Sequence, residues 1–150
     1  MEFVYTIYEF YKAGGDGKCL GELETRVLIE VFKELCKDDN DRVEDMRMSA
    51  VLKILSINLR YNRSWGEMEE ADMGEALLLL LQNRNHDSCY VLDVMYTLFF
   101  FSRHTTNAYV GRKLLEQCEK WIADGIHAVG PCGGKKISWF VELCTKNLEL

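Results

Sequence analysis

The feature that most constrains this chain is the segment Cys89–Phe101, which is apolar on nearly every face. Its valines, tyrosines and phenylalanines would suit a β-strand, but it is thirteen residues long and its neighbours have helical period. A helix that is apolar all round belongs in a protein interior, because no side of it favours water. We therefore predict a buried helix over this segment, at the centre of an all-α helical bundle.

The segments around it are amphipathic, with apolar residues recurring every three or four positions. The segment Gly125–Gly134 contains the single proline and should be a loop. The run Leu77–Leu81 is apolar all round and should be deeply buried, and Asp87 or Ser88 should cap the central helix. The other helices expected are Glu2–Lys12, Glu22–Lys37, Val43–Tyr61, Met68–Gln82, the run from Gly111 to Ile122, and Ile137–Leu148.

The composition favours one soluble domain over residues 1–150, because 48% of the residues are hydrophobic, too many for a disordered chain. A net charge of −6 argues against nucleic acid as a partner, since phosphate binding needs clustered cations and the densest basic point is Lys135–Lys136. No apolar run approaches the roughly 20 residues that a bilayer requires, and no basic segment follows Met1. We therefore expect a cytoplasmic protein without a signal peptide and without direct membrane insertion.

The sequence offers little for catalysis or metal binding, and we expect neither an enzyme nor a cofactor. The three histidines are isolated, and the six cysteines contain no Cys-x-x-Cys pair. Cys36 and Cys118 fall on apolar helical stripes, which predicts buried free thiols. His86 and Cys89 are a base and a nucleophile close in sequence, but a helix cap and a core thiol explain them more simply. A small cysteine-dependent enzyme stays open as an alternative.

Two stretches carry specific motifs. Trp121–Gly125, followed by Gly133–Gly134 and Trp139–Leu143, resembles the second homology segment of the Bcl-2 family. Leu59–Met68 resembles the second half of the third homology segment of prosurvival members. The chain departs from the family pattern by an insertion between the first two pieces and by a tryptophan placed directly before Phe140. The expected order of helices agrees with the family along the chain.

The resemblance implies a Bcl-2-like bundle, in which Cys89–Phe101 takes the place of the central hydrophobic helix. It implies an inhibitor of apoptosis that sequesters the Bcl-2 homology-3 helix of pro-apoptotic proteins in a hydrophobic surface groove. The divergent sequence, the short helices and the lack of a hydrophobic tail resemble virus-encoded members. The expected setting is then the host-cell cytoplasm, with recruitment to mitochondria through partners.

The family motif also implies which residues line the groove. A ligand helix needs an apolar trough, and the aromatic residues Tyr61 and Trp65 suit its partly solvated edge. Leu80 and Val94 are equally compatible with ordinary core positions. The family's Asn-Trp-Gly-Arg segment is absent, and Arg84 is the candidate substitute for its arginine. The implied groove residues are Ile57, Arg60, Tyr61, Trp65, Met68, Leu77, Leu80, Arg84, Tyr90, Val94 and Phe140.

Two further possibilities follow from the missing arginine and from the groove itself. A Bcl-2-like viral module can block host innate signalling through a protein-binding surface without taking a homology-3 helix. An apolar groove without a ligand is an exposed patch that a second copy of the chain can cover, so a homodimer is also open.

Overall fold

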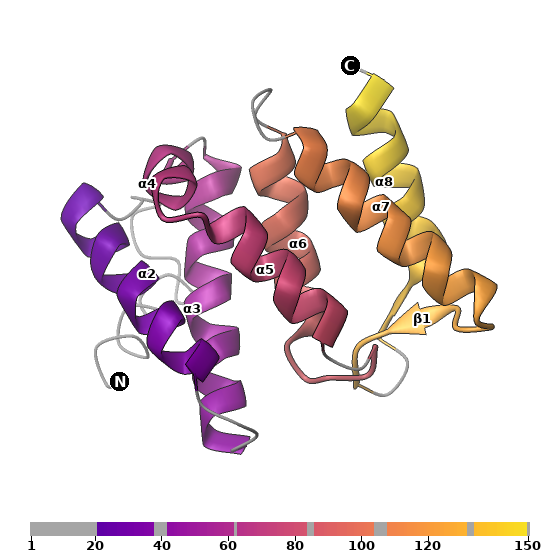
Figure 1. The fold of residues 1–150 in the computed structure, drawn as a ribbon, viewed down its shortest axis with the longest axis horizontal. Coiled ribbons are helices and arrows are strands. Elements are labelled where there is room, and N and C mark those ends of the chain that lie inside the picture. Colours follow the sequence, from indigo (N-terminus) through magenta and orange to yellow (C-terminus); the bar gives the residue numbers. More distant parts are fainter. Residues whose placement is uncertain are drawn as a thin grey trace. The chain divides into compact units, whose positions relative to one another are not determined.

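The computed structural model describes residues 21–37, 42–61, 63–83, 86–103, 108–131 and 134–149 (Figure 1). The expected helix Glu2–Lys12 and the groove candidate Arg84 lie outside these residues. The chain divides into two compact units, Met1–Met73 and Gly74–Leu150. The single domain expected over residues 1–150 stays a prediction, because the compactness of a part does not show that the part folds alone.

The first unit contains α2 (Glu22–Lys37), α3 (Arg42–Arg60) and α4 (Trp65–Glu70), and α2 contacts both of the others (Figure 1). The helices expected over Glu22–Lys37 and Val43–Tyr61 are confirmed to within one residue at each end. One face of α2 is buried at helical spacing, as an amphipathic helix requires, although Leu23 and Val27 of the apolar pattern are exposed. The buried residues of α2 are Thr25, Leu28, Ile29, Phe32 and Leu35.

The single helix expected over Met68–Gln82 is wrong, because the chain breaks between α4 and α5 (Met73–Asn83). Asp72 has a φ of 54°, in the left-handed region. The amide of Ala71 still donates to the carbonyl of Glu67 at 3.2 Å, which closes the last turn of α4. Aspartate accepts the left-handed region more readily than most residues do. The apolar period continues across the break, and it therefore conceals the break in the sequence.

The second unit contains most of α5, followed by α6 (Val91–Ser102), α7 (Ala108–Ala123) and α8 (Ile137–Glu149). The prediction of a helix rather than a strand for Cys89–Phe101 is confirmed, although α6 begins two residues later than expected. α7 packs against both α6 and α8. The buried residues of α6 are Val91, Val94, Met95, Thr97, Leu98, Phe101 and Ser102, and its other residues are half-buried. The described chain is mostly helical, as expected for the all-α class.

The expected cap of α6 is wrong, because neither Asp87 nor Ser88 occupies the N-cap position. Tyr90 holds that position, and its side chain makes no cap hydrogen bond. The residues before Tyr90 form turns, in which the Ser88 carbonyl accepts a hydrogen bond from the Val91 amide at 3.3 Å. These turns keep the two polar side chains upstream of the first helical residue.

The loop expected over Gly125–Gly134 contains a short strand. This strand, β1 (Ala128–Val129), pairs antiparallel with β2 (Lys135–Lys136), which directly follows the loop. Gly130 follows β1 with a φ of 95°, and its amide donates to the His86 carbonyl at 2.7 Å. A Cβ at this glycine would lie 2.7 Å from Leu92 Cδ1, so both backbone and packing require glycine here.

Burial differs from expectation at three positions. Leu79 is 59% exposed, although the other four leucines of the run Leu77–Leu81 are buried. A helix at the surface of a unit keeps one side toward water even when its sequence is all leucine. Cys36 and Cys89, which were expected to be buried, are exposed, whereas Cys118 and Cys144 are buried.

Candidate functional site

Four of the predicted groove residues gather where α3 ends and α4 begins, a surface that we name the α3–α4 corner. Its members are Ile57, Arg60, Tyr61 and Trp65. Tyr61 is 61% exposed, Arg60 is also exposed, and the other two are half-buried. Met68, one turn farther along α4, is fully buried and belongs to the core. The corner thus presents aromatic, aliphatic and cationic side chains to solvent.

A buried polar network holds the α3–α4 corner in place. The Oγ1 of Thr25 on α2 lies 2.9 Å from the Oγ of Ser64, in hydrogen-bond contact. Asn58 on α3 donates through Nδ2 to the same Ser64 oxygen at 2.9 Å. All three residues are at most 9% exposed, and buried polar groups of this kind are stable only when they are hydrogen-bonded. The network therefore ties α2, α3 and the start of α4 together.

Ser64 also carries the sharp turn of the chain at the corner. Its φ is 70°, in the left-handed region, which costs a residue other than glycine roughly 1–2 kcal/mol. Its carbonyl accepts the Met68 amide at 3.0 Å, and the Asn58 carbonyl accepts the Arg63 amide at 2.8 Å. These bonds offset the backbone strain and fix the direction in which Trp65 begins α4.

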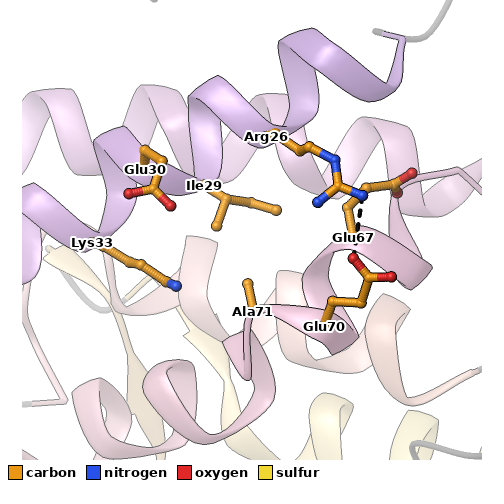
Figure 2. A pocket seen from close by; sticks show the side chains of 7 residues that line it. All are labelled: Arg26, Ile29, Glu30, Lys33, Glu67, Glu70 and Ala71. Carbon is orange, nitrogen blue, oxygen red and sulfur yellow. Dashed lines mark hydrogen bonds and ion pairs between the residues drawn. The ribbon is translucent and has the colours of Figure 1, made fainter.

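A pocket of about 300 Å³ lies between α2 and α4, and no motif in the sequence indicates it (Figure 2). Figure 2 shows Arg26 and Glu70 meeting at one side of the pocket, with Glu30 and Lys33 at the other. The guanidinium Nη2 of Arg26 lies 3.2 Å from Glu70 Oε2 and 3.1 Å from Glu22 Oε1. The lining residues are Arg26, Ile29, Glu30, Lys33, Glu67, Glu70 and Ala71.

Charged side chains of both signs line this pocket. Hydrogen bonds to Glu22 and then to Glu70 raise the pKa of Arg26, so its guanidinium stays charged. Both ion pairs are exposed, and water screens them enough that they contribute little to stability.

The other described groove candidates lie in the second unit and are core residues in this conformation. Leu77 and Leu80 lie on α5, Tyr90 precedes α6, Val94 lies on α6 and Phe140 on α8. None of these five is more than 9% exposed. The Phe140 ring centroid lies 5.2 Å from that of Tyr96 and 5.0 Å from that of Trp139. A ligand helix would reach these residues only after the unit opened.

Metal binding, membrane insertion and thiol chemistry each depend on features that the described residues either have or lack. In the described part of the chain no group of three or more His, Cys, Asp and Glu residues is placed to hold a metal ion. Within the same residues, no helix has both the length and the apolar character needed to cross a bilayer. Cys118 and Cys144 are buried near one another, and burial raises the pKa of Cys118 to about 12 and that of Cys144 to about 11. These two thiols are therefore unreactive at neutral pH.

Sequence reasoning missed Thr25 and Ser64, which position the corner. One signal for them was present, because Asn58 stands on the otherwise apolar face of α3. A buried amide requires hydrogen-bond partners, so it implied polar side chains on the elements packed against it. Nothing in one sequence indicated which hydroxyl residues those were.

The chain matches no protein-family model, no curated protein and no solved structure. The likeness to the Bcl-2 family therefore rests on the residues of the two motifs alone.

Proposed function

We propose that this protein is an inhibitor of apoptosis that binds the homology-3 helix of pro-apoptotic Bcl-2 proteins through its α3–α4 corner. The observation that carries the proposal is the exposure of Tyr61, at 61%, beside a buried hydrogen-bond network that fixes its surroundings. Arg60, Tyr61 and Trp65 belong to Leu59–Met68, the stretch that resembles the third homology segment. The proposed setting is the cytoplasm of a virus-infected host cell.

The chemistry of the corner fits one edge of an amphipathic helix. Such a ligand presents apolar anchors one turn apart and acidic residues beside them. Tyr61 and Trp65 offer large apolar surface with a polar tip, the residue type that dominates binding energy at interfaces. Arg60, the exposed residue directly before Tyr61, is placed to attract a ligand carboxylate. Such an attraction acts mainly on the rate of association.

A second function is favoured by a different observation. Leu77, Tyr90, Val94 and Phe140 are at most 3% exposed, so the trough that the family motif implies is not open in this conformation. A Bcl-2-like viral module that blocks host innate signalling through its outer surface needs no such trough. In that case the α3–α4 corner contacts a folded partner and binds no isolated helix.

A panel of synthetic homology-3 peptides separates the two functions. Fluorescence anisotropy of labelled peptides should show saturable binding, and Tyr61→Ala should weaken it by about 1–2 kcal/mol, roughly 5- to 30-fold. Leu23→Ala is the matched control, because Leu23 is a large apolar residue of the same unit that is 72% exposed and belongs to α2, which contributes no residue to the corner. If no peptide binds below millimolar concentration, the second function replaces the first.

A further inference from the structure

A second apolar surface lies in the second unit, on α5 and α7. Leu79 is 59% exposed and Tyr109 is 39% exposed, and both line one hollow of about 160 Å³. We name this surface the α5–α7 face. Its residues are Glu75, Leu78, Leu79, Gln82, Tyr109 and Lys113.

The size of the hollow suits one aliphatic side chain. A cavity of about 150 Å³ is enough to hold a benzene molecule, and the hollow between α5 and α7 is of that order. Leu79 lines the hollow, and its largely exposed side chain is an aliphatic group of similar size. The same face therefore carries both a knob and a hole.

The charges of the α5–α7 face lie on different helices. A Cβ at Gly74 would lie 3.2 Å from a Val110 methyl carbon and 3.5 Å from Tyr109 Oη, so the first turn of α5 lies beside the first turn of α7. Glu75 belongs to that end, whereas Lys113 lies one turn farther along α7. A negative and a positive charge thus line the same hollow from two helices, about one turn apart.

We propose that a second copy of this chain covers the α5–α7 face in a two-fold dimer. Two-fold symmetry requires a surface that is complementary to itself, and this face carries a knob with a hole and an acid with a base. A two-fold rotation that exchanges the positions of the two charged residues places Lys113 of each copy against Glu75 of the other. In the dimer Lys113 exchanges its ion pair with Glu116 for one with Glu75 of the other copy. The exchange costs little, because the Lys113–Glu116 pair, with 3.5 Å between Nζ and Oε2, is exposed and contributes little free energy.

The dimer is tested by analytical ultracentrifugation of the full chain over a wide concentration range. The natural protein should show a concentration-dependent dimer, and Leu79→Glu should leave a monomer. Leu23→Glu is the matched control, because it places the same charge on an exposed leucine of α2 and should leave the dimer intact. Circular dichroism should show that both variants stay helical, since neither leucine is buried.

Charge exchange tests the proposed pairing directly. Glu75→Lys and Lys113→Glu should each raise the dimer dissociation constant at least about tenfold, which corresponds to about 1.4 kcal/mol. The double variant should restore the dimer, because the two charges then meet in reverse. A monomer at every concentration, or a dimer that Leu79→Glu leaves unchanged, would overturn the proposal. Peptide binding at the α3–α4 corner is a separate measurement, so either result stands without the other.

Discussion

Asn58 donates a hydrogen bond to Ser64 across the start of α4, with 2.9 Å between Nδ2 and Oγ. The amide side chain is fully buried, and the serine it contacts has a left-handed backbone conformation. This one contact connects the polar residue that interrupts the apolar face of α3 with the turn that directs Trp65. The shape of the α3–α4 corner depends on it.

Replacement of Asn58 should therefore destabilise the protein. Asn58→Leu removes the donor and leaves the Ser64 and Thr25 hydroxyls with fewer partners in a buried site, which should cost about 1–3 kcal/mol. Urea unfolding followed by circular dichroism measures the loss. Ser56→Ala is the control, because the Ser56 hydroxyl donates to the Lys53 carbonyl of its own helix and the residue is half-buried. A loss for Asn58→Leu no larger than that of the control would contradict the role of the network.

Two substitutions at Ser64 separate backbone strain from hydrogen bonding. Ser64→Ala removes the hydroxyl and keeps a side chain at a φ of 70°, whereas Ser64→Gly removes the hydroxyl and the strain together. The alanine variant should therefore unfold more easily than the glycine variant, by about 1 kcal/mol. Thermal and urea unfolding of both proteins gives the comparison. The reverse order would show that the turn is not strained.

Phe140 should act on stability more than on peptide binding. Its side chain is fully buried against Tyr96 and Trp139, so Phe140→Ala should cost about 3–5 kcal/mol through lost packing and a cavity. Trp139→Ala, at a position that is 37% exposed, should cost clearly less. Differential scanning calorimetry of the two variants provides the test. Equal and small losses would mean that α8 is not part of the core.

The buried thiols should make stability fall at high pH. Burial raises the pKa of Cys118 to about 12 and of Cys144 to about 11, from an ordinary value of 9.0. Between pH 9 and these values the unfolded chain loses thiol protons that the folded chain keeps, so the free energy of unfolding decreases as pH rises. The contribution is fully present below pH 9 and is lost as the pH rises through the folded pKa values.

Two measurements check this prediction. At neutral pH a thiol reagent should label the exposed Cys36 and Cys89 quickly and label Cys118 and Cys144 only after unfolding. Urea unfolding of the natural protein and of Cys118→Ala should then show a shallower alkaline decline in the variant. Rapid native labelling of Cys118 would contradict its burial.

The long helices were predictable because their apolar residues keep one period from end to end. The bounds of α2 and α3 follow from this pattern to within a residue, and α6 was identified as a helix from its length and its neighbours. The break at Asp72 was missed because the apolar period continues through it. The cap of α6 was missed because turn geometry, rather than the preference of Ser88, determines where the helix starts.

Burial was harder to predict than helix formation. The leucine run of α5 contains no polar residue to mark its outer side, yet Leu79 is exposed. At the candidate site, Tyr61 is exposed and Trp65 is half-buried, and their place at the edge of a groove stays a prediction. Leu77, Tyr90, Val94 and Phe140 carry no mark in the sequence that distinguishes a groove wall from a core position, because the same side chains suit both.

The central claim is that the α3–α4 corner binds a homology-3 helix, and a nuclear magnetic resonance titration tests it most directly. Adding an unlabelled homology-3 peptide to the isotope-labelled protein should shift the amide signals of Ile57, Arg60, Tyr61 and Trp65. The signals of Leu79 and Tyr109 on the α5–α7 face should stay in place. Shifts confined to other residues, or no shifts at saturating peptide, would contradict the claim.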